Sequence, residues 1–330
     1  MTAVAPQTIH FQVECRTAES SESQVQVLVP GDAAYEVRQD SFWSNSAKLR
    51  PAAIVRPSSA NDVSAVIKSL VAAKQPFAVR SGGHWNVVGG SNIEGGVTID
   101  LGRLNKVAYT AASETASIGP GCRWQEVYDE LHKHGRAVAG GREGEVGVAG
   151  LLLGGGNTFF AARRGFACDD VVAYEVVLAD GRIVNVDKGN HSDLFRSLKG
   201  GSNNFGIVTK FTMTAIPCDK VWGGMAFLPK DAIPAAIEAV TSFTDNVAND
   251  PDSNLVAMCT HTPDFKDVVV ATHYANVAGV EKAPAYEKFL ALPELHNTTK
   301  MTSVAEMAFE YNMPANMQYV LPDSPLFYSR

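Results

Sequence analysis

The first clear pattern is a helical repeat of apolar residues that begins near residue 60. Five apolar positions have the i, i+3, i+4, i+7, i+8 spacing of one buried helix face: Val63, Val66, Ile67, Leu70 and Val71. Asp62 follows Ser59 by three residues, which is the spacing of a helix capping box. Short apolar stretches at 53–56 and 77–80, each next to a proline, predict a strand on either side. This region is therefore a β-α-β unit, and residues 81–84 form the loop that leaves its second strand.

Further along the chain, strands and helices mix without regular alternation. Trp124 to His134 has apolar residues on one helical face, and Gly135 suits its C-cap position. Asp180-Gly181 separates two apolar runs and predicts a hairpin turn. The other predicted elements are strands at 97–101, 107–109, 116–118, 171–178, 182–186 and 206–216 and a short helix at 193–199. This order favours an α+β fold over a doubly wound parallel sheet.

The pattern changes after Pro217. Charge changes there too: residues 1–217 hold 21 basic and 21 acidic side chains, whereas residues 218–330 hold 7 basic and 14 acidic ones. We therefore expect two domains, 1–217 and 218–330, with different roles. The second has predicted strands at 221–228, 255–261 and 267–275 and an alanine-rich helix at 232–245 that is apolar at positions 233, 236, 237 and 240.

The composition disfavours several classes of protein. The 330 residues are 45% hydrophobic and 19% charged, which is typical of a folded chain, and the net charge of −7 disfavours nucleic-acid binding. No apolar run approaches about 20 residues, so we expect no membrane span. The first ten residues lack the features of a secretory signal, which favours a cytoplasmic location. The five cysteines are odd in number and lack Cys-x-x-Cys spacing. They fit neither a disulfide framework nor a zinc site, and no metal is expected.

Glycine is concentrated in one part of the chain. Twenty-four of the 28 glycines lie between Gly82 and Gly206, with clusters at 81–84, 144–150 and 154–156. Clustered glycine permits positive φ and close approach of the backbone, as expected of loops that hold a phosphate through backbone N–H groups. The motifs Gly-x-Gly-x-x-Gly, P-loop, Gly-x-Ser-x-Gly and His-Glu-x-x-His are all absent. The sequence thus predicts a bulky anionic ligand without a familiar phosphate fingerprint.

Several glycine-containing motifs follow one another in a recognisable order. They are Arg80-Ser-Gly-Gly-His84, Gly89-Gly90, Gly119-Pro-Gly121-x-x-Trp124, Gly147-Val-Ala-Gly150 leading into Gly154-Gly-Gly156, Gly165 through Asp170, and Gly200-Gly-Ser-Asn-Asn-Phe-Gly-Ile-Val-Thr209. Over about residues 45–217 the chain resembles the FAD-linked oxidases with the vanillyl-alcohol-oxidase and p-cresol-methylhydroxylase (PCMH) fold. It is most similar to the berberine-bridge-enzyme-like branch, and to fungal members that serve secondary metabolism.

This resemblance implies the domain organisation. Residues 1–217, with a core at about 45–217, resemble a PCMH-type FAD-binding domain. Residues 218–330 resemble part of an antiparallel-sheet substrate domain. The family's C-terminal segment, which carries a Tyr-x-Asn-Tyr-like motif, does not follow here. We therefore expect a fragment, a misannotated gene product or a divergent short member.

The resemblance also implies the cofactor, FAD, and a single covalent anchor, His84, on the 8α carbon of the flavin. Taken alone, a histidine after two glycines is more often a hydrogen-bonding loop residue. Imidazole is a neutral nucleophile near pH 7, which suits the anchoring role. The cysteine that gives some relatives a second bond is missing from 141–147, so one bond at most is expected, and Cys122 and Cys168 are expected to be buried as small hydrophobic residues. By resemblance the cofactor-binding residues are Arg80, Ser81, Gly82, Gly83, His84, Gly144, Glu145, Val146, Gly147, Gly150, Gly154, Gly155, Gly206, Ile207 and Val208.

The implied activity is that of an oxidase. A hydride passes from an alcohol, a sugar or a secondary-metabolite intermediate to the flavin, which O2 reoxidises, and the protein supplies positioning and electrostatics. The expected partners are a small-molecule substrate and O2, with no nucleic acid and no membrane. The catalytic residue is not assigned: the sequence does not choose among five candidates for a general base, each of which also reads as a surface or core-edge residue. They are His261, His273, Tyr274, Glu310 and Tyr311.

Three alternatives to the oxidase stay open. One is a catalytically impaired flavin-binding remnant that lacks the C-terminal segment. Another is a flavin dehydrogenase in which Leu151–Leu153 shields the flavin from O2. A reductase that uses NADPH is less favoured, because such members lack the histidine anchor.

Overall fold

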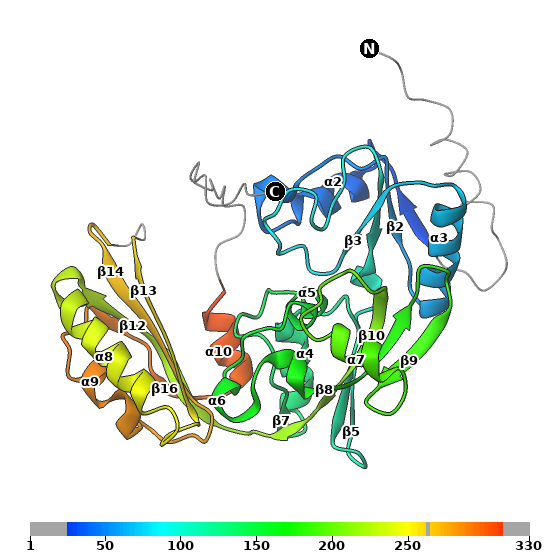
Figure 1. Ribbon diagram of the computed structural model, residues 1–330. Coiled ribbons are helices and arrows are strands. Elements are labelled where there is room, and N and C mark those ends of the chain that lie inside the picture. The colour runs from blue at the N-terminus through cyan, green and yellow to red at the C-terminus, as the bar shows by residue number, and fades with distance from the viewer. Residues whose placement is uncertain (1–24, 262–264, 313–330) are drawn as a thin grey trace.

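The structure is a computed structural model that describes residues 25–261 and 265–312. Its first sheet has the strand order β1-β2-β4-β3, and Figure 1 labels β2 and β3 of this sheet. Strands β2, β4 and β3 run parallel, and β1 pairs with β2 in the antiparallel sense. The elements of this part are β1 (Gln26–Leu28), α2 (Ala33–Asp40), β2 (Ala53–Arg56), α3 (Ala60–Ala72), β3 (Phe77–Arg80) and β4 (Val97–Asp100).

Helix α3 packs against both the first sheet and the second. It begins as its capping signal predicts, because Ser59 Oγ accepts a hydrogen bond from Asp62 N at 3.1 Å. Its buried apolar face shares a core with Val177 and Ile207, which belong to the second sheet. The helix therefore fixes the two sheets relative to each other along one side.

The second sheet is antiparallel and has the order β5-β6-β10-β8-β9. Helix α4 packs its buried face into the largest core and ends at His132, two residues before the predicted end. Gly135 nevertheless has the expected positive φ, +63°. The elements of this part are β5 (Val107–Thr110), β6 (Thr115–Ile118), α4 (Trp124–His132), β7 (Arg136–Ala137), α5 (Val148–Leu153), α6 (Ala161–Arg164), β8 (Val171–Val177), β9 (Ile183–Asp187), α7 (Ser192–Ser197), β10 (Ile207–Thr214) and β11 (Ile216–Pro217), which pairs with β7.

A separate antiparallel sheet follows, with the order β13-β14-β12-β15. Helices α8 and α9 cover one of its faces (Figure 1). Helix α8 buries Ala236 and Ala239, whereas Ile237 and Val240 are exposed. Small side chains let the helix approach the sheet closely, so the buried face differs from the one suggested by the larger apolar residues. The elements are β12 (Val221–Pro229), α8 (Ile233–Asp245), β13 (Ser253–Thr260), β14 (Val269–Asn276), α9 (Glu287–Leu290), β15 (His296–Asn297) and β16 (Lys300–Thr302), which also pairs with β12.

The final described helix, α10 (Val304–Glu310), packs back against α4. In Figure 1 it lies between the last sheet and the helices of the second sheet. Its residues Val304, Ala305, Met307 and Ala308 are buried in the same core as α4. Residues 304–310 therefore connect the last sheet to the rest of the molecule.

The α+β class and the antiparallel second part are confirmed by this architecture. Cys122 and Cys168 are buried, as expected. The sequence reasoning did not predict β1 or α2. No helix in the described ranges combines the length and the apolar character needed to cross a bilayer.

Candidate cofactor-binding site

The first glycine loop, residues 81–84, begins where β3 ends. Gly83 has a φ of +72°, and a Cβ on it would lie 2.7 Å from Arg80 Nε. A Cβ on Gly82 would lie 2.6 Å from Gly147 Cα. Because neither position has room for a side chain, the loop can rest on Arg80 and touch the second glycine stretch directly.

Arg80 supports this loop from beneath. Its side chain is buried and donates to Arg38 O at 2.7 Å and to Ser41 O at 3.0 Å. The guanidinium also lies 3.6 Å from the centre of the Phe42 ring. Burial, and then the positive charge of Arg38, lower the pKa of Arg80 to about 9. Arg80 is therefore part of the support of the loop, and the structure places it outside the cavity described below.

The backbone of this loop presents donors that have no acceptor in the part of the chain that the structure describes. Among the described residues, no acceptor pairs with the N–H groups of Gly82, Gly83 and His84. The carbonyls of Gly82 and Gly83 accept bonds from Arg123 Nη2 (3.2 Å) and Trp43 N (3.1 Å). Because the C=O and N–H of a trans peptide unit point in opposite directions, the N–H groups of Gly83 and His84 point away from these donors. Successive N–H groups without an acceptor, next to a residue at positive φ, can form an anion-binding nest.

The second glycine stretch crosses the first. A Cβ on Gly147 would lie 2.5 Å from Gly82 N, so the two backbones are in contact. At its start the stretch is held by α10 and the residues after it: Gly144 N donates to Ala308 O at 2.9 Å, and Glu145 N donates to Asn312 Oδ1 at 3.0 Å. The stretch then continues into α5.

Arg123 joins the two stretches. Its guanidinium donates to Gly82 O through Nη2 and to Glu145 O through Nη1. The next residue, Trp124, also binds the second glycine stretch, because its N–H donates to Val146 O at 3.1 Å. The segment before α4 therefore sets the spacing of the two loops.

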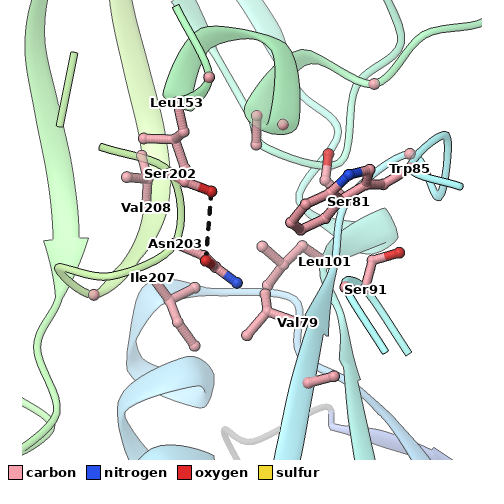
Figure 2. A pocket seen from close by; sticks show the side chains of 18 of the residues that line it. Val79, Ser81, Trp85, Ser91, Leu101, Leu153, Ser202, Asn203, Ile207 and Val208 are labelled. Atoms are coloured by element: carbon pink, nitrogen blue, oxygen red, sulfur yellow. Dashed lines mark hydrogen bonds between the residues drawn. The ribbon is translucent and has the colours of Figure 1, made fainter. Parts of the chain in front are cut away.

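These loops form one wall of a cavity of about 790 Å³. Figure 2 shows Val79, Ser81, Trp85, Ser91 and Leu101 on one side of it, and Leu153, Ser202, Asn203, Ile207 and Val208 on the other. The predicted residues that line it are Ser81, Gly82, Gly83, His84, Val146, Gly147, Gly150, Gly154, Gly206, Ile207 and Val208. Arg80, Gly144, Glu145 and Gly155 are not in its lining.

The sequence reasoning missed an apolar part of the lining. Val71 and Phe77 are 51% and 37% exposed, and both line the cavity. Val71 was expected in the buried face of α3, but at this end the face borders the cavity instead of the core. Also missed were Ile67, Val79 and Leu101.

A polar part of the lining was missed as well. Ser202, Asn203 and Asn204 line the cavity, and Ser202 N donates to Leu153 O at 2.9 Å. These residues lie within the last of the recognised motifs, which was the signal that pointed to them. Only its Gly206, Ile207 and Val208 had been assigned to the site.

His84 lies in the cavity wall between two side chains from other segments. Its ring stacks on Trp43, with centroids 4.2 Å apart and an interplanar angle of 17°. Its Nε2 lies 3.7 Å from Glu143 Oε1, which is longer than a hydrogen bond, and has no hydrogen-bond partner among the described residues. The imidazole is thus held by packing on one face, with a carboxylate near one nitrogen.

Two of the five candidates for a general base lie together where the end of α10 meets the last sheet. The rings of His273 and Tyr311 have centroids 3.9 Å apart, and Tyr311 OH donates to Gly224 O at 3.2 Å. Burial, and then the charge of Arg142, lower the pKa of His273 to about 4. Burial raises the pKa of Tyr311. At neutral pH this pair is therefore an uncharged imidazole beside an uncharged phenol.

The other three candidates are placed differently. Tyr274 is buried in the core under α8 and α9, on the opposite face of the sheet. Glu310 accepts a hydrogen bond from Thr298 Oγ1, and His261 is exposed beyond β13. None of the five lines the cavity. Within the described ranges, no three His, Cys, Asp or Glu side chains form a group that could hold a metal.

Comparison with known proteins shows which proteins the chain is similar to. A family model for an FAD binding domain matches residues 51–187. The chain is 41% identical over 299 residues to the FAD-dependent monooxygenase sdcF of Emericella nidulans, covering 89% of this chain and 62% of the relative. It is 39% identical over 313 residues to the FAD-dependent monooxygenase drtC of Aspergillus calidoustus. That match covers 93% of this chain and 60% of the relative. The chain therefore contains an FAD-binding domain and is similar to fungal FAD-dependent monooxygenases over about nine tenths of its length. The resemblance drawn from the motifs is thereby confirmed.

Solved structures of flavin-dependent oxidases and related proteins share the fold. The 6-hydroxy-D-nicotine oxidase of Arthrobacter nicotinovorans aligns with a TM-score of 0.76 at 24% identity, covering 88% of this chain and 64% of that one. The berberine-bridge-enzyme-like protein 1 of Physcomitrella patens aligns with a TM-score of 0.77 at 20% identity. The alignment covers 94% of this chain and 66% of that one. The chain spans about three fifths of the length of the curated relatives described above.

The cavity fits FAD. Its volume lies within the roughly 300–1,000 Å³ that is typical of small-molecule and cofactor sites. The nest of N–H groups at Gly82–His84 suits a diphosphate, and the apolar lining from α3 and β3 suits a flat ring. Because the loop residues Gly82, Gly83 and Gly147 have no side chains, a ligand can approach their backbone closely.

Proposed function

We propose that the cavity binds FAD with its pyrophosphate on the backbone N–H groups of Gly82, Gly83 and His84. The observation that carries this proposal is that these N–H groups have no acceptor among the described residues and lie in the cavity wall. A diphosphate oxygen would supply the missing acceptor without any basic side chain. Residues of the second stretch and of β10 would then pack along the rest of the cofactor.

We propose further that His84 anchors the flavin through a single covalent bond at the 8α carbon. His84 is a lining residue, its ring is held by Trp43, and no cysteine occurs in residues 141–147. An imidazole nitrogen is a competent nucleophile near neutral pH. The bond would fix the cofactor in place and leave the other contacts to orient it.

The reaction we propose is oxidation of a small molecule. When bound, FAD supplies the hydride acceptor, and O2 is the proposed final acceptor. The substrate class is an alcohol, a sugar or a secondary-metabolite intermediate. This is supported by the two fungal FAD-dependent monooxygenases and by a related structure, the xylooligosaccharide oxidase from Myceliophthora thermophila C1 in complex with xylobiose.

The test is reconstitution of the purified chain with FAD. Uptake of yellow cofactor with quenched fluorescence is expected, and a denaturing gel should show a fluorescent band that His84→Ala lacks. Failure of folded protein to bind FAD would disprove the cavity assignment. A bound flavin that no alcohol or sugar bleaches without O2 would instead favour a flavin-binding chain that does not catalyse oxidation by itself.

A further inference from the structure

Two side chains from separate segments surround His84, and their arrangement is specific. Trp43, which follows α2, stacks on the imidazole and also donates its backbone N–H to Gly83 O at 3.1 Å. This contact ties the backbone of Trp43 to the loop that carries His84 and so holds the indole beside the imidazole. The ring plane of His84 is thereby fixed.

With the plane fixed, the position of Nε2 is determined by the side facing Glu143. The Nε2–Oε1 distance is 3.7 Å, and both side chains are largely buried, at 24% and 17% exposure. Nε2 has no hydrogen-bond partner among the described residues, which is costly for a buried polar atom. A shift of less than about 1 Å would bring the pair to hydrogen-bond distance. Such catalytic contacts are often long before the ligand is bound.

We infer that Glu143 is a positioning residue for His84 that accepts the Nε2–H hydrogen bond. This inference rests on the proposed covalent role of His84. A neutral imidazole carries one hydrogen, so a hydrogen held at Nε2 leaves the lone pair on Nδ1. Glu143 thus selects Nδ1 as the nitrogen that attacks the 8α carbon.

Covalent attachment would form a C–N bond from Nδ1 to the 8α carbon and break one 8α C–H bond, whose proton would go to solvent and whose electron pair would stay on the flavin. The substituted imidazole would lose its Nε2 proton to Glu143, which would pass it on to solvent. O2, the acceptor of the proposed function, would take those two electrons together with two protons from solvent and give H2O2. Glu143 therefore acts twice: it orients the imidazole before the attack and receives the proton after it.

The experiment separates the binding of FAD from the attachment of FAD. The full chain, purified without flavin, is mixed with saturating FAD, and the covalent fraction is followed by fluorescence of the denatured band and by the mass of the His84 peptide. For Glu143→Gln we expect attachment at least tenfold slower, while the FAD dissociation constant changes less than twofold. Glu143→Asp should recover part of the rate. Glu130→Gln, which removes an exposed carboxylate on α4 that is paired with Lys133, is the matched control and should behave as wild type.

The outcomes distinguish this inference from the proposed function. Attachment by Glu143→Gln at the wild-type rate would overturn the role of Glu143 and leave the His84 bond standing. A wild-type chain that binds FAD but never forms a fluorescent denatured band would overturn both the His84 bond and this inference, while leaving FAD binding intact. If Glu143→Gln unfolds, Glu143→Ala with added acetate decides: acceleration by acetate supports the role of the carboxylate, and its absence in folded protein contradicts it.

Discussion

Gly147 and Gly150 lie three residues apart in the same stretch, yet their surroundings differ completely. A Cβ on Gly147 would lie 2.5 Å from Gly82 N, which is rigid backbone, whereas a Cβ on Gly150 meets nothing within 4 Å. At Gly147 the missing side chain therefore allows two loops to touch. At Gly150 it leaves space in the cavity, which that residue lines.

We predict opposite effects of alanine at these two positions on the protein without flavin. Gly147→Ala should force the loops apart and destabilise the fold by about 1–3 kcal/mol. Gly150→Ala lies within helix α5 and should stabilise it by up to about 1 kcal/mol, while weakening FAD binding by filling the cavity. Thermal unfolding and FAD titration measure the two effects. Equal melting temperatures for both variants would contradict the contact between Gly82 and Gly147.

A second prediction at this scale concerns His273 and pH. Burial, then the charge of Arg142, lower the pKa of His273 in the folded protein to about 4, below its ordinary value of 6.5. As pH falls from about 6.5 to 4, the unfolded chain binds a proton at this site that the folded protein does not. Stability from this residue is therefore complete above pH 6.5 and is lost as the pH falls toward 4.

His273→Gln should reduce the loss of stability on acidification, since glutamine does not titrate. The measurement is the melting temperature at pH 7.5 and pH 5.0 for the wild type and the variant. The melting temperature of the wild type should fall more between pH 7.5 and pH 5.0 than that of the variant. The same loss in both proteins would show that other groups account for the acid sensitivity.

At the scale of elements, the segment before α4 holds the two glycine stretches together through Arg123. Arg123→Met removes its bonds to Gly82 O and Glu145 O but keeps the aliphatic part of the side chain. Because these carbonyls then lose their charged donor, the N–H groups of the loop are less well oriented, and we expect FAD to bind roughly tenfold more weakly, about 1.4 kcal/mol. FAD titration of the purified variant measures this change.

The control for this prediction is the stability of α4. Arg123 N still donates to Glu126 Oε2 at 2.7 Å in the variant, so the helix cap is retained. The melting temperature without FAD should therefore change little. A variant that binds FAD as tightly as the wild type would show that the glycine contacts alone set the spacing of the loops.

The sequence predicted elements well where one local rule dominates. The apolar spacing and the Ser59 cap gave α3, and Asp180-Gly181 gave the β8–β9 hairpin. The sequence did not predict which face of a helix is buried where tertiary packing determines it. Helix α8 buries its alanines instead of its larger apolar residues, and Val71 lines a cavity that is formed together with residues of the second sheet. For the site, eleven of the predicted residues line the cavity, whereas its apolar side and Ser202–Asn204 were missed.

The remaining parts of the site could not be read from the sequence for a similar reason. Trp43 contacts His84 from a segment that carries no motif, and the Arg123 bonds require two loops to meet. The 3.7 Å approach of Glu143 to His84 depends on the same meeting. Contacts of this kind form between residues far apart in the chain, and no local spacing records them.

At the scale of the whole molecule, α10 connects the last sheet to the cofactor loops. Its buried side packs on α4, and its Ala308 carbonyl accepts the N–H of Gly144 at 2.9 Å. On the other side, Met307 lies against the last sheet, where a Cβ on Gly223 would come within 2.8 Å of its sulfur. One short helix therefore contacts both the sheet that carries His273 and the stretch that borders the cavity.

This arrangement predicts that a change in α10 alters FAD binding at a distance. Met307→Ala leaves a cavity in the core and should cost about 2–5 kcal/mol. Because the helix then loosens its hold on Gly144, we also expect weaker FAD binding. Phe309→Ala, on the exposed side of the same helix, should change stability by less than about 0.5 kcal/mol and leave FAD affinity unchanged. Thermal unfolding and FAD titration of both variants provide the test. A destabilised Met307→Ala with wild-type FAD affinity would show that α10 stabilises the fold without coupling the last sheet to the cofactor site.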